Sequence, residues 1–297
     1  MDKRNSPLKH PQVRLDAAVA GPLFMLSAAL LFTLLNLLIK LLGPEFTVWH
    51  IGFYRFAGGW IIIWALFGRH HNPFKGNDIG LLIIRGCVGS VAFISIVTAI
   101  RILPVSTAMV IFYSFPAFAA IFSFLLYGER VGRVELACIA AAMVGVGVLF
   151  EFRLAGGLYG HTIALVGGAF AGLTVTLIKT LREKNGPVVI YFYFCTMGTL
   201  VTLPKFILHP VWPSTPVAVV MILGIVFVSL SAQLLMNQGF FYCKGWEGGV
   251  LMSSEVVFTA LIGILFLEDP TTPRFWVGGL MIFSSVVALN RMKGRSK

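Results

Sequence analysis

Long apolar runs separated by short polar gaps dominate this chain. Ten runs can be placed, each near the ~20 residues that a helix needs to cross a bilayer. They cover residues 20–40, 49–67, 79–100, 105–127, 134–150, 160–179, 188–204, 216–238, 247–267 and 274–290. Turn-forming and charged residues fill the gaps, as in GRHHNPFKGND at 68–78, and no gap could hold a soluble domain. The pattern predicts an all-α integral membrane protein with ten transmembrane helices.

Composition and charge agree with a lipid environment. The chain is 58% hydrophobic and only 12% charged, whereas soluble domains are about 25% charged. The net charge of +11 would suggest nucleic acid in a soluble protein, but most of the 23 lysines and arginines lie in gaps that fall on one side of the bilayer. The positive-inside rule then predicts a multi-pass protein of the inner or plasma membrane, with both termini cytoplasmic and no nucleic-acid partner.

An internal repeat divides the chain into halves. Matching residues recur at a constant offset of 139 positions, in the pairs Gly21 and Gly160, Lys40 and Lys179, and Glu129 and Glu268. A unit of five spans is odd, so the second copy must lie inverted in the bilayer. Inverted repeats are typical of alternating-access carriers, whose substrate site lies near the midplane where the halves meet. The expected parts are a tail at 1–19, repeats at 20–153 and 154–290, and a second tail at 291–297.

Several motifs in this order resemble one transporter family over nearly the whole chain. They are the opening span GPLFMLSAALLFTLLNLLIK, the FYRF of the second span, the fourth-span pattern with Pro116, Gly128 and Glu129, GGAFAGLTVTLIK in the sixth span, and the ninth span with Glu255 and Glu268. Together they resemble the EamA family of the drug/metabolite transporter superfamily. The resemblance implies a ten-helix, inverted-repeat carrier of small metabolites without naming the metabolite. Two positions depart from the family pattern: Val256 follows the acid, and Phe194 stands where the repeat of Arg55 would fall.

One acid is placed deep in the predicted bilayer. Glu255 lies near the middle of GGVLMSSEVVFTALIGILFLE, residues 248–268, whereas the other acids fall in tails, loops or helix ends. An ionisable group at that depth costs at least a few kcal/mol. Glu255 is therefore predicted to bind a cationic group of the substrate or to take up a proton. The structural alternative is a fixed salt bridge to Arg55 or Arg85.

Further polar residues could complete a substrate site. Arg55 and Arg85 are the bases well within predicted spans, and either could hold a substrate carboxylate or brace the helices. Ser229, Gln233 and Asn237 recur every four residues, so they share one face of the eighth span and line either the translocation path or a helix contact. The weaker candidates for substrate binding are Asn36, Tyr113 and Thr259. Gly168, Gly172 and Thr176 form a stripe that predicts close helix packing.

The predicted function is a secondary transporter of a small organic solute, an amino acid or a related zwitterionic or cationic metabolite. Proton coupling through Glu255 is left open. No catalytic motif, metal-ligand spacing or cofactor-binding loop appears, so we expect no enzymatic activity, no metal and no cofactor. The alternatives are an intramembrane or lipid-modifying enzyme, and a channel or structural membrane subunit. The expected partners are the substrate and the lipid bilayer, and the sequence does not set the oligomeric state.

Overall fold

The structure, a computed structural model of the chain, describes residues 17–68, 74–103, 105–149, 157–266 and 273–295. Most of the predicted N-terminal tail, the last two residues and Glu268 lie outside these ranges. Within them every regular element is a helix, as the apolar runs predicted.

The helices form two series of six along the described chain. The first series comprises α1 (Ala17–Leu41), α2 (Val48–Phe67), α3 (Ile79–Ile102), α4 (Val105–Phe112), α5 (Phe115–Tyr127) and α6 (Arg133–Leu149). The second series comprises α7 (Leu158–Leu181), α8 (Pro187–Leu208), α9 (Pro216–Tyr242), α10 (Gly245–Met252), α11 (Ser254–Phe266) and α12 (Pro273–Arg295).

Seven helical segments within the described ranges are long and apolar enough to cross a membrane. They are Val19–Leu41, Val48–Phe67, Ile79–Ile102, Thr107–Tyr127, Leu158–Leu181, Pro187–Leu208 and Pro216–Tyr242. The other three predicted spans are shorter or divided. Helix α6 has 17 residues, the ninth run is divided into α10 and α11, and the apolar part of α12 is limited to Trp276–Leu289. Length and composition therefore support seven of the ten predicted crossings directly.

The fourth and ninth runs are each interrupted near their middle. The first break lies at Tyr113–Ser114, between α4 and α5, and the second lies at Ser253, between α10 and α11. Pro116 explains the first break, because it has no N–H to donate and its ring would clash with the carbonyl four residues earlier. Ser114 and Ser253 are separated by the same 139 positions as the sequence repeats. The repeat thus extends to the place where each helix breaks.

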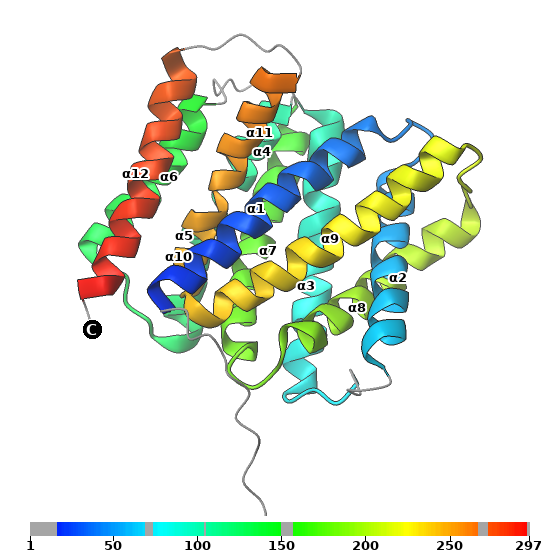
Figure 1. Cartoon of the computed structure of the whole chain (residues 1–297), viewed down its shortest axis with the longest axis horizontal. Coiled ribbons are helices and arrows are strands. Elements are labelled where there is room, and N and C mark those ends of the chain that lie inside the picture. The colour runs from blue at the N-terminus through cyan, green and yellow to red at the C-terminus, as the bar shows by residue number, and fades with distance from the viewer. Residues whose placement is uncertain (1–16, 69–73, 104, 150–156, 267–272, 296–297) are drawn as a thin grey trace, which may run out of the picture.

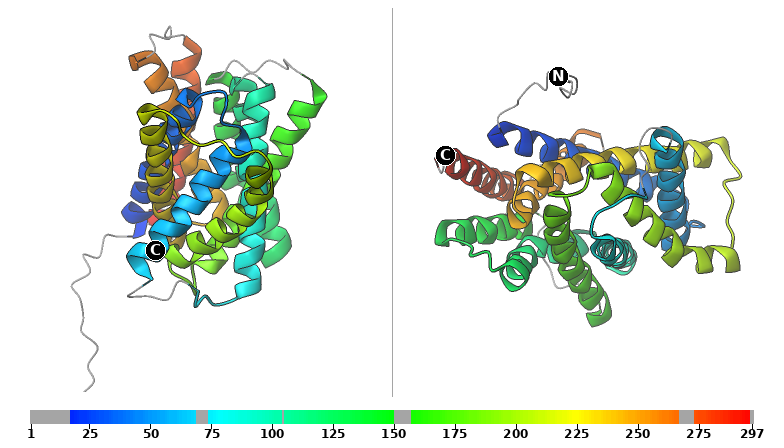
Figure 2. Two further views of the ribbon diagram at one scale, coloured as in Figure 1. Left: turned by 90° about the vertical axis from the view of Figure 1, so that its right-hand side faces the viewer. Right: turned by 90° about the horizontal axis from the view of Figure 1, so that it is seen from below.

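Helices of one series pack mainly against helices of the other. Helix α1 packs on α9 and α3 on α7, while α2 pairs with α8 and α6 with α12 (Figure 1). Figure 2 shows α1 and α9 on one side of the molecule and α3 and α7 on the other. The broken helices also meet, since a Cβ on Gly249 of α10 would lie 3.2 Å from Cβ of Pro116 in α5. Because most helices pack against a helix of the other series, the centre of the molecule is formed by both halves together.

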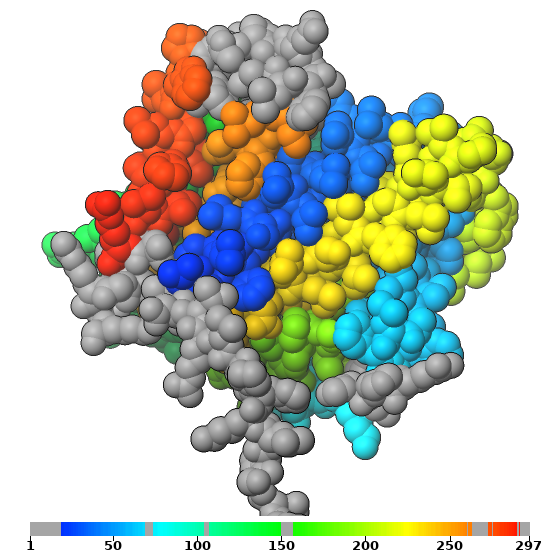
Figure 3. All heavy atoms as spheres, viewed as in Figure 1, coloured from blue at the N-terminus to red at the C-terminus, as the bar shows by residue number. Residues whose placement is uncertain are grey.

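The outer faces of the helices carry large apolar side chains. Examples with at least half of their surface exposed are Leu30, Ile61, Phe124, Leu200 and Phe227. Figure 3 shows one such face, formed by α1, α9, α11 and α12. Contiguous apolar surface on this scale is unfavourable in water and suits contact with lipid tails.

Candidate functional site

A cavity of about 160 Å³ lies between the two series of helices. Because a single water needs only roughly 10–15 Å³ measured in this way, the cavity can hold several waters or a small organic molecule. Its wall is mostly aromatic and aliphatic, with Phe32, Phe93, Ile96, Phe112 and Phe115 among the lining residues. The polar side chains that line it are Asn36, Arg55, Arg85, Tyr113, Thr174, Gln233 and Glu255.

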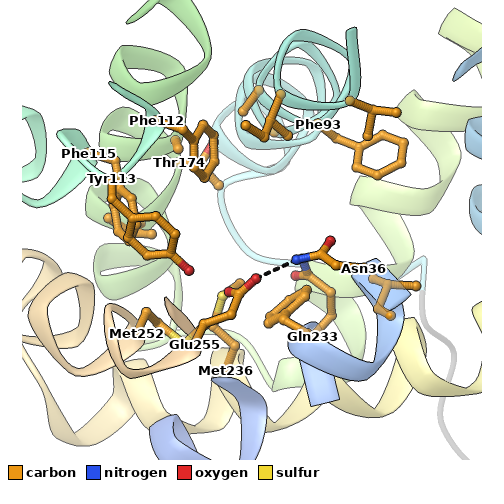
Figure 4. A pocket seen from close by; sticks show the side chains of 18 of the residues that line it. Asn36, Phe93, Phe112, Tyr113, Phe115, Thr174, Gln233, Met236, Met252 and Glu255 are labelled. Carbon is orange, nitrogen blue, oxygen red and sulfur yellow. Dashed lines mark hydrogen bonds between the residues drawn. The ribbon is translucent and has the colours of Figure 1, made fainter. Parts of the chain in front are cut away.

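Glu255 enters this cavity from the first turn of α11, directly after the break at Ser253. The residue is 8% exposed. Its Oε1 accepts a hydrogen bond of 2.7 Å from Nδ2 of Asn36 on α1, and the hydroxyl of Tyr113 points toward the same carboxylate (Figure 4). A negative charge in the first turn of a helix is also favoured by the helix dipole. The break thus places the carboxylate at a helix N-terminus inside the cavity.

The backbone of Glu255 is fixed by hydroxyl groups. Its carbonyl oxygen accepts hydrogen bonds from Oγ1 of Thr33 at 3.2 Å and Oγ1 of Thr259 at 2.8 Å. Thr33 lies on α1 and Thr259 lies one turn further along α11. The bond from Thr33 holds the start of α11 against α1, beside the pair formed by Glu255 and Asn36, whereas the bond from Thr259 lies within α11.

Two arginines line another part of the same cavity. Arg55 on α2 is 3% exposed and Arg85 on α3 is 1% exposed. The guanidinium carbon of Arg55 lies 4.3 Å from the centre of the Phe93 ring, and that of Arg85 lies 4.2 Å from the centre of the Phe194 ring. Arg85 also donates from Nη2 to Oε1 of Gln233 at 3.3 Å. Cation–π contacts of this kind partly offset the desolvation of a buried guanidinium.

The alternative role of Glu255, a fixed salt bridge to Arg55 or Arg85, is not seen among the described residues. Among the described residues, no ion pair joins Glu255 to Arg55 or Arg85. The structural alternative for Glu255 is therefore not observed, and the acid and the two bases contact the cavity separately.

The predicted stripe on α9 divides into one residue that lines the cavity and two that do not. Gln233 lines it. Ser229 donates to the carbonyl of Val226 in its own helix, and Asn237 donates from Nδ2 to the carbonyl of Pro187. Both are fully buried in helix contacts. Thr259 likewise supports the backbone of Glu255 without lining the cavity.

Sequence reasoning missed two features of this region. The first is the aromatic support of the arginines by Phe93 and Phe194, which belong to different halves of the chain. The second is Arg182, whose guanidinium donates to the carbonyls of Asn237 and Asn185 and to Oε1 of Gln238. A basic residue at the end of a helix was the available signal for Arg182, but its burial against α9 depends on tertiary packing. No group of three or more metal-ligating side chains occurs in the part of the chain that the structure describes.

The profile of the EamA-like transporter family matches residues 19–150 and, a second time, residues 158–291. This chain belongs to the EamA-like transporter family. The two matches correspond to the two series of helices, so each series is one EamA repeat. The resemblance inferred from the sequence motifs is confirmed.

Relatives of this EamA protein are also transporters. The pseudopaline exporter CntI of Pseudomonas aeruginosa is 26% identical over 280 residues, covering 94% of this chain and 99% of CntI. Human solute carrier family 35 member G1 is 24% identical over 233 residues, covering 73% of this chain and 62% of the carrier. A solved crystal structure with 18% identity shares the fold, with a TM-score of 0.76 over 93% of this chain and 98% of its own. The expectation of a membrane transporter rather than an enzyme is confirmed.

Proposed function

We propose that this EamA protein is a secondary transporter that moves an amino acid or a related zwitterionic or cationic metabolite by alternating access. The observation that carries this proposal is Glu255, a buried carboxylate that faces a cavity between two repeats and has no cationic partner among the described residues. An uncompensated charge in a low-dielectric site is costly. A substrate ammonium group can supply the missing positive charge.

The proposed architecture has ten crossings arranged as two inverted five-helix repeats, 20–153 and 154–290. Three observations support it: the exchange of packing partners between halves, the breaks at Ser114 and Ser253, and the position of the described start of α1 and end of α12 at the same end of the molecule (Figure 1). An even number of crossings leaves both ends of a chain on one side of the bilayer. By the positive-inside rule, the lysine and arginine distribution supports a cytoplasmic location for that side, in the inner or plasma membrane.

The two interrupted helices support a carrier mechanism. Transporters with inverted repeats form substrate sites where interrupted helices meet near the midplane. Here α11 begins beside α1, and Glu255 of α11 is bonded to Asn36 of α1. Rocking of one helix set against the other would alternately expose this pair to each side. Proton uptake by Glu255 in the absence of substrate would discharge the site and couple transport to the proton gradient.

Counterflow in proteoliposomes tests this proposal. Vesicles loaded with unlabelled L-amino acids should accumulate external radiolabelled L-amino acids, and Glu255→Gln should reduce the initial rate at least tenfold, or about 1.4 kcal/mol of lost stabilisation. Glu183→Gln is the matched control, because it removes one acid from an exposed position between α7 and α8. Unchanged transport by Glu255→Gln, with unchanged pH dependence, would remove Glu255 from the mechanism. Conductance that does not saturate with solute would favour a channel instead.

A further inference from the structure

We propose that Arg55 and Arg85 together form a second subsite, which binds carboxylates, and that the transported solute is a net-anionic amino acid with two carboxylates and one ammonium group. This inference rests on the proposed function and specifies an acidic amino acid in place of the related zwitterionic or cationic metabolites. It differs from a simple zwitterion site, in which one arginine would be sufficient.

Both guanidinium groups have unused hydrogen-bond donors. Nε of Arg55 and both Nε and Nη1 of Arg85 are buried without an acceptor among the described residues. Among the described residues, the one hydrogen bond that either guanidinium donates is from Arg85 to Gln233. Buried donors of charged groups that lack acceptors are unfavourable, because they have given up their hydrogen bonds to water without a replacement. A ligand with several acceptor oxygens would satisfy them.

A third buried arginine shows what a structural guanidinium looks like in this fold. Arg182, also buried, directs its nitrogens at three oxygen acceptors, the carbonyls of Asn237 and Asn185 and the side chain of Gln238. Arg182 also lies over a ring, that of Phe241 at 5.1 Å. Arg55 and Arg85 differ from it because they line the cavity and have buried donors without an acceptor among the described residues. The donors that these two guanidinium groups leave unpaired are therefore available to a carboxylate, which the fork shape of a guanidinium matches in geometry.

The charges that line the cavity do not balance. Among its described lining residues there are two arginines and one acid, Glu255. Both guanidinium groups lie within 6 Å of the centre of the same ring, Phe194, so two like charges share a small apolar region. A bound solute with one ammonium and two carboxylates would compensate all three side chains at once. A neutral zwitterion would leave one arginine without a counter-charge.

A polar path joins the two subsites. Asn36, which is bonded to Glu255, lies beside Gln233 on the cavity wall (Figure 4), and Gln233 accepts the hydrogen bond from Arg85. Phe93, which carries Arg55 on its face, lies across the cavity from Glu255 (Figure 4). An amino acid lying along this path would place its ammonium group at Glu255 and its carboxylates at the arginines.

Ligand binding to the purified full-length protein tests this subsite. Isothermal titration with L-aspartate, L-glutamate, L-glutamine, L-lysine and succinate separates the contributions of the second carboxylate and of the ammonium group. We expect the two acidic amino acids to bind at least tenfold more tightly than any of the other three solutes. Titration with sodium chloride in parallel tests whether an inorganic anion occupies the same subsite.

Variants connect this preference to the two arginines. Arg55→Gln and Arg85→Gln should each weaken L-glutamate binding at least tenfold while changing L-glutamine binding much less, and the lysine variants at the same positions should restore part of the loss. Lys205→Gln removes one positive charge from an exposed position on α8 and should leave the preference unchanged. Circular dichroism and melting temperature check that each variant is folded, and the panel on the unaltered protein tests the inference without any variant.

The outcomes separate this inference from the proposed function. Counterflow of L-glutamine or L-lysine with no preference for acidic amino acids would overturn the anionic subsite and leave the transporter intact. Chloride that binds as tightly as L-glutamate in an arginine-dependent manner would also overturn it, by identifying an inorganic-anion site. Tight binding of L-glutamate without counterflow would support the subsite and contradict the transport cycle. Absence of both binding and counterflow would contradict both proposals.

Discussion

At the scale of single residues, the partner of Glu255 is an amide rather than a cation. Asn36 donates to the carboxylate at 2.7 Å, and the cations of the cavity lie elsewhere. A hydrogen bond from a neutral donor holds a carboxylate in place without cancelling its charge. The site can therefore be preorganised and still attract a substrate cation.

A side-chain exchange tests this pair. Asn36→Asp should lower the melting temperature and abolish counterflow, because two carboxylates in contact cannot both be ionised favourably. Combining it with Glu255→Gln restores one acid and one amide, and the double variant should recover much of the stability, since a hydrogen bond to a charged group contributes about 1.5–3 kcal/mol. Thermal unfolding in detergent is the measurement. A double variant no more stable than Asn36→Asp would contradict the proposed coupling of the two side chains.

Residue identity predicted part of this site. The depth of Glu255 followed from its place in a long apolar run, and Arg55 and Arg85 were candidates for the same reason. The sequence did not show that the arginines lie against Phe93 and Phe194, or that Ser229 and Asn237 face helix contacts instead of the cavity. A helical repeat of four places residues on one face, but the neighbours along that face are supplied by other helices.

At the scale of the elements, glycines allow the closest helix approaches. A Cβ on Gly172 of α7 would lie 2.8 Å from the backbone oxygen of Phe115 and 2.8 Å from the backbone nitrogen of Ala119, both on α5. Backbone atoms cannot rotate away as a flexible side chain can. The small-residue stripe predicted from the sequence therefore packs α7 against the helix that follows the first break.

Replacing this glycine should separate the two helices. Gly172→Ala is expected to destabilise the protein by about 1–3 kcal/mol through overpacking. Gly147→Ala is the matched control, because a Cβ there would meet no atom within 4 Å, and alanine favours a helix over glycine by up to about 1 kcal/mol. Melting temperatures in detergent should fall for the first variant and stay equal or rise for the second. An equal effect of both variants would contradict the packing role of Gly172.

At the scale of the whole molecule, polar contacts join the halves at opposite ends of α2. At one end, backbone N–H of Asn77 donates to Oδ1 of Asn185 at 2.7 Å, Nδ2 of Asn185 donates to the carbonyl of Asn77, and Lys184 pairs with Asp78 at 2.9 Å. Near the N-terminus of α2, His50 bonds the carbonyl of His209 and Tyr54 donates to the carbonyl of Val211. An alternating-access cycle would have to break one set while keeping the other.

Weakening one set of contacts should therefore open the cavity to one side of the membrane, and weakening the other set should open it to the opposite side. Asn185→Ala should increase the rate at which a membrane-impermeant thiol reagent labels Ala92→Cys in the cavity from the side of Asn77, and His50→Ala should increase labelling from the side of His209. The four native cysteines would be replaced by alanine in all variants. Lys184→Gln is a control with a smaller expected effect, because its partner and Lys184 itself are largely exposed. Increased labelling from the same side in both variants would contradict the opposing roles.

The pKa of Lys184 sets the pH range over which its ion pair with Asp78 is present. The hydrogen bond and charge of Asp78 raise the pKa of Lys184 above its ordinary value. A raised lysine pKa means that the contact is present below the ordinary lysine pKa and is lost as the pH rises through the raised one. Between about pH 5 and 8 the lysine stays charged, so titration of Lys184 does not account for pH dependence of transport in that range.

The sequence by itself determined the membrane class, the twofold repeat, the family and the acid at the centre, because each depends on composition or on spacing along one chain. The tertiary structure decided which polar residues share a cavity, where the fourth and ninth helices break against each other, and why two arginines have unused donors. These features arise because helices of one repeat pack against helices of the other. Packing between segments far apart in the chain sets which helix faces meet. The hydropathy of one segment does not show which other helices pack against it.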